Sequence, residues 1–266
     1  MDLKVICDEV KTLSIDVGAF IRDQLHQVST DQIITKDHNS LVTYVDQTAE
    51  KKIVAKLQEL LPDASFITEE DTVKQEAGNL VWIIDPLDGT TNFLQKIPHF
   101  AVSIALRRDE DIVLGVVFDV MREECFSAVK GEGAFVNDRK ISVSQKDSID
   151  ECVLATGFPY SKSLNFKPLI NTLEHWMLHA RGIRRFGAAA LDLCFVAAGR
   201  IDCYYELKLN IWDVAAGMLI VEEAGGTLSD YNGGDSFREG NQVVASNGYI
   251  HPYILNILQQ NFKTSS

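Results

Sequence analysis

The spacing of apolar residues changes twice along this chain, and this change constrains the fold more than any other sequence feature. From Leu3 to Ile21 apolar residues recur at steps of three and four, which predicts one buried face of a helix, and a second helix is predicted from Asp46 to Leu61. From Ala64 onward, short apolar runs bounded by turns predict a sheet. After about residue 150, expected strands alternate with expected helices, so the sequence predicts a layered α/β fold.

The expected elements fill most of the chain. Strands are expected at 65–67, 80–84, 100–106, 112–118, 124–129, 152–155, 183–186 and 201–205, with a further short strand before the turn at 232–234. Later helices are expected at 166–179, 188–198, 213–224 and 250–262, and the polar stretch Thr35–Ser40 is expected to be a mobile loop. Because no repeat or long linker interrupts the chain, residues 1–266 are expected to form a single compact unit, with an N-terminal α+β half at 1–150 and a C-terminal α/β half at 151–266.

The charge balance disfavours nucleic acids and anionic membranes as partners. With 25 Lys and Arg against 38 Asp and Glu, the net charge is −13, which repels nucleic-acid phosphates and anionic membrane surfaces. Neither is therefore expected as the main partner. If the substrate is a phosphate, local cations or a bound metal must reverse the sign of the field at the site.

Cysteine usage and the N-terminus indicate a cytoplasmic protein. The five cysteines include no C-x-x-C pair, so neither a disulfide framework nor a structural zinc site is predicted. The N-terminus has no cleavable apolar core, and no apolar run approaches the roughly 20 residues of a membrane-spanning helix.

The stretch from Trp82 to Phe93, WIIDPLDGTTNF, carries the clearest chemical signal. An apolar strand leads directly into Asp85 and Asp88, and the carbonyl of Leu87 offers a third oxygen between them. Hard oxygen ligands of this kind suit Mg²⁺. The amides of Gly89 and Thr90 follow at the expected start of a helix, where they could hold an anion.

Each acidic motif has a second reading when it is taken alone. Asp, Pro and Gly are common turn residues, so D-P-x-D-G alone is equally typical of an acidic turn. Glu69 and Glu70 follow an expected strand, and Asp213 begins an expected helix, where an Asp is most often an N-cap.

Taken in order, three segments resemble the inositol monophosphatase family of Mg²⁺-dependent, Li⁺-sensitive phosphatases. They are Thr68–Glu70, Trp82–Phe93 and Trp212–Gly217. Leu41–Asp46, Gly187–Ala190 and Tyr204–Glu206 extend the resemblance to nearly the whole chain, from about residue 5 to 260, and Ala155–Tyr160 resembles the bacterial branch. The resemblance implies an α-β-α-β-α sandwich of the sugar-phosphatase type and a homodimer.

The resemblance also implies roles for individual residues. The implied metal ligands are Glu69, Asp85 and the Leu87 carbonyl for a first Mg²⁺, and Asp85, Asp88 and Asp213 for a second, with a third Mg²⁺ near Glu69 in some relatives. The implied catalytic residues are Thr90 and Asp46, which would position and deprotonate water, together with Glu69. The implied substrate contacts are the Gly89 and Thr90 amides for phosphate, Ala189 and Glu206 for hydroxyl groups, and Lys36, which reads equally well as a solvated loop lysine.

The implied reaction is Mg²⁺-dependent hydrolysis of a small phosphate monoester by a metal-activated water, without a phosphoenzyme. The expected substrate is myo-inositol 1-phosphate or a similar polyol or sugar phosphate. Fructose 1,6-bisphosphate, NADP and 3′-phosphoadenosine 5′-phosphate are the alternatives within this class. A regulatory relative that binds a macromolecule is the alternative from another class, and it is disfavoured because every expected ligand is present and the net charge is −13.

Overall fold

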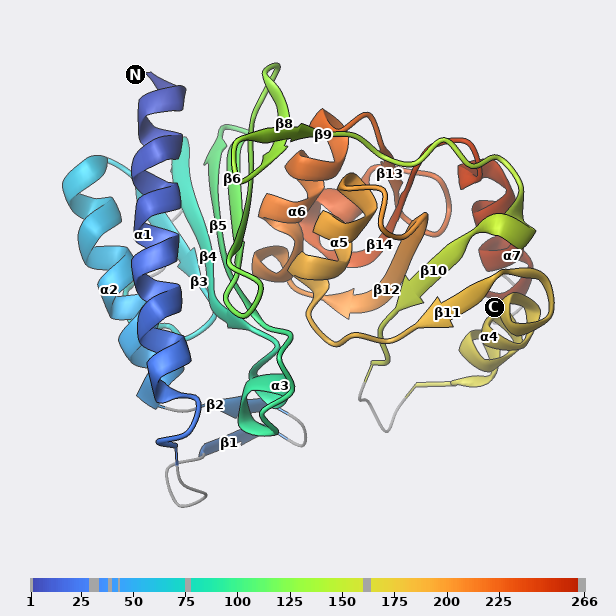
Figure 1. Ribbon diagram of the computed structural model, residues 1–266, viewed down its shortest axis with the longest axis horizontal. Helices are drawn as coiled ribbons and strands as arrows, with labels where there is room; N and C mark the ends of the chain where they lie inside the picture. Colours follow the sequence, from blue (N-terminus) through green and yellow to red (C-terminus); the bar gives the residue numbers. More distant parts are fainter. Residues whose placement is uncertain are drawn as a thin grey trace.

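Two β-sheets and three layers of helices form the frame of the molecule (Figure 1). The computed structural model describes residues 2–28, 44–74, 78–159 and 164–262, and the backbone of 34–37 and 40–42. Across Figure 1 the layers follow in the order α1 and α2, a seven-stranded sheet, α5 and α6, a five-stranded sheet, and α4 and α7. This arrangement confirms the α/β class and the α-β-α-β-α layering expected from the sequence.

The bounds of the elements are as follows. The helices are α1 (Leu3–Gln24), α2 (Tyr44–Leu60), α3 (Thr90–Leu94), α4 (Lys167–His179), α5 (Ala189–Ala197), α6 (Ile211–Glu223) and α7 (His251–Phe262). The strands are β1 (Ile34–Asp37), β2 (Ser40–Val42), β3 (Ser65–Thr68), β4 (Leu80–Asp88), β5 (Ala101–Arg108), β6 (Asp111–Asp119), β7 (Glu124–Val129), β8 (Gly133–Val136), β9 (Arg139–Ile141), β10 (Val153–Thr156), β11 (Gly182–Arg184), β12 (Cys203–Leu209), β13 (Thr227–Ser229) and β14 (Asn241–Ser246).

The seven-stranded sheet follows the chain from β3 to β9, with each strand beside the next. Only β3 and β4 run parallel, so their carboxyl ends lie at the same edge of the sheet. The helix α1 begins after the N-cap Asp2 and buries Ile6, Val10, Val17 and Ile21, the periodic apolar residues that predicted it. Together with α2 it covers one face of the sheet.

The five-stranded sheet has the order β11-β10-β12-β14-β13. Its strand β10 runs parallel to β11 and β12, whereas β14 is antiparallel to its two neighbours, β12 and β13. The helices α4 and α7 cover its outer face (Figure 1). Its strands come from residues 153–246 and those of the larger sheet from 65–141, and the division of the chain into halves at residue 150 stays a prediction. That the chain is a single unit stays a prediction.

The helices α5 and α6 lie between the two sheets and are buried almost all round. Every residue of α5 is buried, as are residues 214–221 of α6. A helix that is apolar on every side needs neighbours on every side, which explains why these two segments occupy the centre of the molecule. Side chains at the ends of these two helices are therefore held in fixed positions.

Several strands were not expected from the sequence. These unexpected strands are β1, β2, β8, β9 and β14, all of which are short or partly polar. They form because a neighbouring strand satisfies their backbone hydrogen-bonding groups. The loop expected at Thr35–Ser40 is wrong where β1 and β2 pair, and its residues 38–39 lie outside the described part of the chain. Within that part no helix is long and apolar enough to span a membrane.

We expect Gly115→Ala to destabilise the protein, because β6 and α6 touch at this glycine. A methyl group at Gly115 would lie 2.7 Å from the carbonyl oxygen of Ala216 and 3.0 Å from its Cα, so strand and helix would have to separate. Overpacking of this kind costs about 2 kcal/mol of unfolding free energy, which denaturant unfolding measures. Gly182→Ala is the control, because its nearest neighbour is the mobile end of Arg184, and it should change stability by less than about 0.5 kcal/mol. Equal effects of the two substitutions would contradict this account.

Candidate active site

A β-bulge in β4 brings Asp85 and Asp88 to the same side of the sheet. Residues three apart on a regular strand point to opposite faces. Between the pairs Asp85–Ser103 and Asp88–Ala101, however, β4 has two residues where β5 has one, so the alternation is reset. The first of these two residues is Pro86, which has no N–H to offer to the ladder. The bulge thus places two carboxylates on one side of an otherwise apolar strand. The residues are only 2% exposed for Asp85 and 8% exposed for Asp88.

Glu69 reaches the same edge of the sheet from β3. It directly follows this strand, and its backbone N–H donates to the carbonyl of Ile84, which places it beside Asp85. The segment around it is held by the buried carboxylate of Glu50 on α2. That carboxylate accepts hydrogen bonds from the Thr68 hydroxyl at 3.0 Å, the Glu70 N–H at 2.8 Å and the Thr72 N–H at 2.8 Å. Glu50 was not singled out in the sequence, yet it fixes the backbone on both sides of Glu69.

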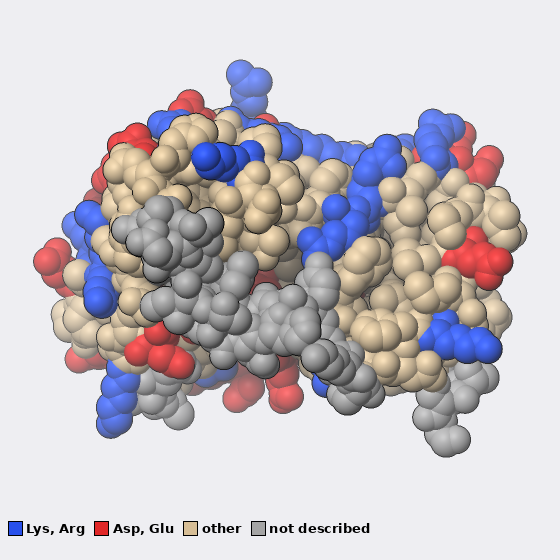
Figure 2. All heavy atoms as spheres, turned by 90° about the horizontal axis from the view of Figure 1, so that it is seen from below, with Lys and Arg blue, Asp and Glu red and all other residues tan. Residues whose placement is uncertain are grey.

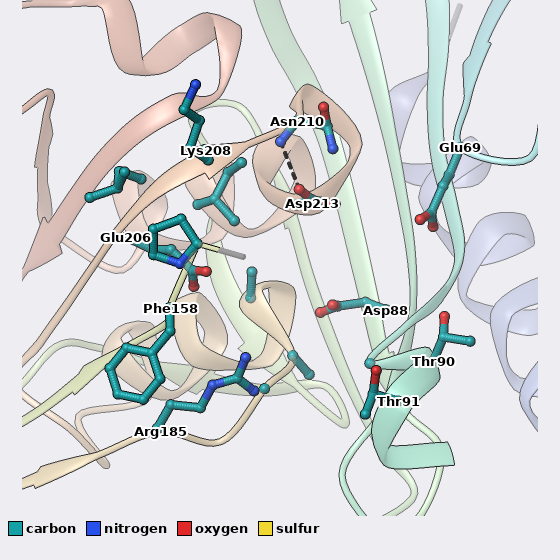
Figure 3. A pocket seen from close by; sticks show the side chains of 17 residues that line it. Glu69, Asp88, Thr90, Thr91, Phe158, Arg185, Glu206, Lys208, Asn210 and Asp213 are labelled. Atoms are coloured by element: carbon teal, nitrogen blue, oxygen red, sulfur yellow. Dashed lines mark hydrogen bonds between the residues drawn. The ribbon is translucent and has the colours of Figure 1, made fainter. Parts of the chain in front are cut away.

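Asp213 comes from the first turn of α6 and has two tasks. Its Oδ2 accepts a hydrogen bond from the N–H of the N-cap residue, Asn210, at 2.7 Å, which completes a capping box. It also lines the cavity that Glu69 and Asp88 line (Figure 3). The N-cap role considered from sequence therefore belongs to Asn210, and Asp213 supports the cap while facing the other acids.

The cavity lies between the two sheets and measures about 510 Å³, which is within the usual range for a small-molecule site. In Figure 3, Asp88, Thr90 and Glu69 approach it from one side and Glu206, Phe158 and Arg185 from the opposite side. Of the residues proposed from sequence, seven line the cavity: Glu69, Asp88, Gly89, Thr90, Ala189, Glu206 and Asp213. Asp46, Asp85 and Leu87 are buried behind that surface.

The acids of this cavity have raised pKa values. Burial is the largest cause for each, and the charges of neighbouring acids add to it, notably that of Asp213 on Glu69 and Asp88. The pKa rises to about 8 for Glu69 and Asp88 and to about 7 for Asp213. The pKa of Asp85 lies well above its usual value because of burial, the charges around it and a hydrogen bond to Glu69. None of these four acids takes part in an ion pair among the described residues.

A cation fits this donor set chemically. Four carboxylates are crowded together with no cation paired to them in the described part of the chain, and a divalent metal would relieve their repulsion. Within the described ranges, no three side chains already surround one point as metal ligands do. Local donors explain part of this spread, because Asp85 accepts from the Leu87 N–H at 2.9 Å and Asp88 from the Ala190 N–H at 2.8 Å. The donors suit Mg²⁺, and binding would draw their free oxygens together.

Thr90 joins the acids to α2. Its hydroxyl lies 3.1 Å from Oδ1 of Asp46 and 3.1 Å from the carbonyl oxygen of Leu87, so its one proton is shared between two acceptors. Gly89 precedes it with φ at +90°, a left-handed conformation that glycine adopts without strain and that lets β4 turn into α3. The structure therefore brings together Thr90, Asp46 and Leu87.

The opposite wall belongs to the five-stranded sheet and α5. Ala189 begins α5, and the first amides of this helix donate to Asp88, so the helix orients one of the acids. Glu206 projects from β12, with Arg185 near it (Figure 3). Burial raises the pKa of Glu206, while the Tyr204 hydroxyl and the charge of Arg185 lower it. The side chain of Lys36 lies outside the described part of the chain.

Sequence reasoning missed several residues of the cavity wall. They are Phe158, Pro159, Arg185, Lys208 and Asn210. Lys208 reaches the cavity because the register of β12 shifts there and the residue adopts φ of +69°, which no local pattern predicted. Arg185 had a weak signal, because it lies two residues before the Gly187–Ala190 segment. Asn92 was inside the central motif, and its amide donates to the carbonyls of His99 at 2.8 Å and Phe186 at 2.9 Å.

Lys and Arg side chains are unevenly distributed over the surface. Figure 2 views the molecule from below Figure 1 and shows them gathered in a band near the middle of that face. Arg181, Arg184 and Arg185, at both ends of β11, are among the exposed basic residues. A net charge of −13 therefore does not make every face acidic.

Comparisons with known proteins agree with this geometry. The family model of the inositol monophosphatases matches residues 2–263. "Nus factor SuhB" of Pasteurella multocida is 42% identical over 229 residues, 86% of each chain, and "Inositol-1-monophosphatase" of Rhizobium meliloti is 40% identical over 244 residues, 91% of this chain and 92% of the relative. The solved structure of the extragenic suppressor protein suhB from Bartonella henselae has a TM-score of 0.91 at 38% identity, covering 96% of this chain and 99% of that one.

The raised pKa values predict that the metal-free protein loses stability as the pH rises from about 5 to about 8. In this range the folded chain keeps protons on Glu69, Asp88 and Asp213, whereas the unfolded chain, with carboxyl pKa values near about 4, has released them. Asp88→Asn should flatten the decline, because it removes one of the repelling charges. Mg²⁺ should raise the Tm more at about pH 8 than at about pH 5.5, because it competes with protons for the same oxygens.

Thermal unfolding of chelator-treated wild type and Asp88→Asn, with and without added Mg²⁺ at the two pH values, measures both effects. Comparing the two proteins cancels the pH dependence of carboxylates outside this cluster. Identical slopes in wild type and variant would contradict the assigned pKa of Asp88.

Proposed function

This chain belongs to the inositol monophosphatase family, and we propose that it hydrolyses a small phosphate monoester, most readily myo-inositol 1-phosphate, with Mg²⁺ as cofactor. The observation that carries the proposal is the crowding of Glu69, Asp85, Asp88 and Asp213 at one cavity with raised pKa values. Such an arrangement is unfavourable by itself and favourable around a cation. Clefts with perturbed acids are the usual place for catalysis.

In this proposal Glu69, Asp85 and the Leu87 carbonyl hold one Mg²⁺, and Asp85, Asp88 and Asp213 hold a second, with a third near Glu69. When bound, the metal supplies the positive charge that the acids lack and acts as a Lewis acid toward water and phosphate oxygens. The amides of Gly89 and Thr90 donate to the phosphate at the turn where β4 enters α3.

Thr90 and Asp46 accept the proton of the attacking water in two linked transfers. The Thr90 hydroxyl can donate to Asp46, 3.1 Å away, while its oxygen accepts a hydrogen bond from the water. A proton that leaves the water for Thr90 Oγ1 can be matched by the transfer of the Thr90 proton to Asp46. Glu69 accepts a further hydrogen bond from the water and keeps its oxygen directed at the phosphorus, so no phosphoenzyme is needed.

The leaving group lies against the other wall of the cavity. There Glu206 accepts hydrogen bonds from hydroxyl groups of the polyol, and the backbone at Ala189 contacts the ring. Lys36 is proposed to approach the phosphate. Fructose 1,6-bisphosphate, NADP and 3′-phosphoadenosine 5′-phosphate remain the competing substrates. Inhibition by Li⁺ and a homodimer stay predictions from family membership, and a cytoplasmic location stays a prediction from cysteine usage and the N-terminus.

A second candidate function is the one named in "Nus factor SuhB". Relatives with that name and relatives named "Inositol-1-monophosphatase" are 42% and 40% identical to this chain, so identity does not choose between them. The band of Lys and Arg in Figure 2 favours a binding role, because it offers an anionic macromolecule a surface despite the net charge. A complete set of acids is compatible with both catalysis and binding of a macromolecule. A variant that no longer hydrolyses the ester separates the two, because it should keep a binding role and lose a catalytic one.

Phosphate release from a panel of esters tests the enzymatic proposal. We expect purified protein to release phosphate from inositol 1-phosphate in the presence of Mg²⁺ and to lose the activity in EDTA. The panel includes fructose 1,6-bisphosphate, NADP and 3′-phosphoadenosine 5′-phosphate, which identify the competing substrates. If none of the four esters is hydrolysed with Mg²⁺, the proposal is wrong.

Asp88→Asn should lower kcat/KM by about a hundredfold or more while leaving the fold intact. The amide oxygen can still accept the 2.8 Å hydrogen bond from the Ala190 N–H, so the loss is one of charge at the metal. Steady-state phosphate release and circular dichroism measure activity and fold. The control is Asp111→Asn, an exposed carboxylate paired with Lys130 at the far end of β6, which should retain wild-type activity. Full activity of Asp88→Asn would refute the assigned ligand set.

A further inference from the structure

The carboxylate of Glu206 is held from several sides. Its Oε2 accepts a hydrogen bond from the hydroxyl of Tyr204 at 2.6 Å, a short distance typical of a charged acceptor. Below it lies Gly157, where any methyl group would overlap the carboxylate. The charge of Arg185 acts on it from the cavity side (Figure 3). Glu206 thus has one well-defined position on the wall opposite the metal ligands.

Tyr204 is suited to fixing this position because it cannot move easily. Its side chain is fully buried in the core between the two sheets. Its hydroxyl has a single proton, and in the structure that proton is donated to Glu206. The hydrogen bond occupies one acceptor position of Oε2 and leaves the other lone pairs of the carboxylate available to a ligand.

The next residue provides a natural comparison. Tyr205 is equally buried, but it points to the opposite face of the sheet and packs with α4 and α7. Among the residues that the structure describes, its hydroxyl has no hydrogen-bond partner. Two adjacent and equally buried tyrosines thus differ in that only the hydroxyl of Tyr204 donates to Glu206.

We propose that Tyr204 is a positioning residue that orients Glu206 to accept hydrogen bonds from the leaving group, and so makes the site selective for esters of polyols. This inference rests on the proposed phosphatase function. A carboxylate that is free to rotate loses entropy when it binds hydroxyl groups, whereas one that is already oriented does not. Tyr204 is proposed to act through Glu206, to which its hydroxyl donates, so its effect should appear in substrate binding and selectivity.

The test compares two esters. One is myo-inositol 1-phosphate, whose leaving group carries neighbouring hydroxyls, and the other is p-nitrophenyl phosphate, whose leaving group carries none. Tyr204→Phe should raise KM for the inositol ester about tenfold and leave kcat within about twofold, the pattern of lost ground-state binding through a hydrogen bond to a charged group. The kinetic constants for p-nitrophenyl phosphate should stay within about twofold of wild type.

Tyr205→Phe is the matched control. It removes a hydroxyl from the same strand and the same depth of burial, and it should leave the selectivity between the two esters unchanged. An equal loss of selectivity in both variants would mean that general loosening of β12 is responsible, and it would overturn the proposal. So would unchanged selectivity in Tyr204→Phe.

A double-mutant cycle tests whether Tyr204 acts through Glu206. In a Glu206→Gln background, Tyr204→Phe should change KM for the inositol ester by less than about twofold, because the charged acceptor is already gone. If Tyr204→Phe keeps its full effect in that background, the proposal is wrong.

Gly157→Ala displaces the Glu206 carboxylate from the side opposite Tyr204. It is a second test of the proposal if Tyr204→Phe folds poorly. The atoms nearest to the added methyl group are those of the Glu206 carboxylate and not backbone atoms, so the fold should be kept while selectivity for the inositol ester falls. Retained selectivity in this variant would also count against the proposal. Failure of the wild type to hydrolyse either ester with Mg²⁺ is a different result, since it refutes the proposed function itself.

Discussion

Repulsion between carboxylates is the constraint around which this structure is organised. Glu69, Asp85, Asp88 and Asp213 are buried close together, and burial and neighbouring charges raise the pKa of each. The repulsion among these carboxylates is unfavourable, so the surrounding fold must hold them in place. Every member is attached to a backbone element that is fixed for another reason: a sheet edge, a bulge or the first turn of a buried helix.

The attachments have a common form. A backbone N–H donates to an oxygen of the acid, as the Leu87 N–H does for Asp85, the Ala190 N–H for Asp88 and the Asn210 N–H for Asp213. The amides behind Asp88 and Asp213 belong to the beginnings of α5 and α6, the two helices buried between the sheets. The most tightly packed part of the molecule thus supports the part with the least favourable electrostatics.

The sequence revealed the acids but not how they come together. Apolar periodicity located α1 and the strand before Asp85, because burial of an apolar face leaves a local pattern, whereas the order of the layers was implied only by the family resemblance. It could not show that Asp85 and Asp88 share one side, since strand alternation alone places them on opposite faces and the bulge depends on pairing with β5. Glu50, Arg185 and Lys208 were missed for a similar reason, because their positions follow from long-range contacts. The strands β8, β9 and β14 depend on their neighbours in the same way.

The two walls of the cavity are built by different strands and helices. The acids lie on β3, β4 and α6, whereas Tyr204, Glu206, Gly157 and Arg185 lie on or beside β10, β11 and β12. Mutations on the second wall can therefore change the contacts to the leaving group while the proposed metal ligands keep their identity, although the charge of Glu206 also acts on Asp88 and Asp213. In evolutionary terms, a lineage built on this fold can exchange one leaving group for another by a few substitutions around β12 while its reaction chemistry is inherited unchanged.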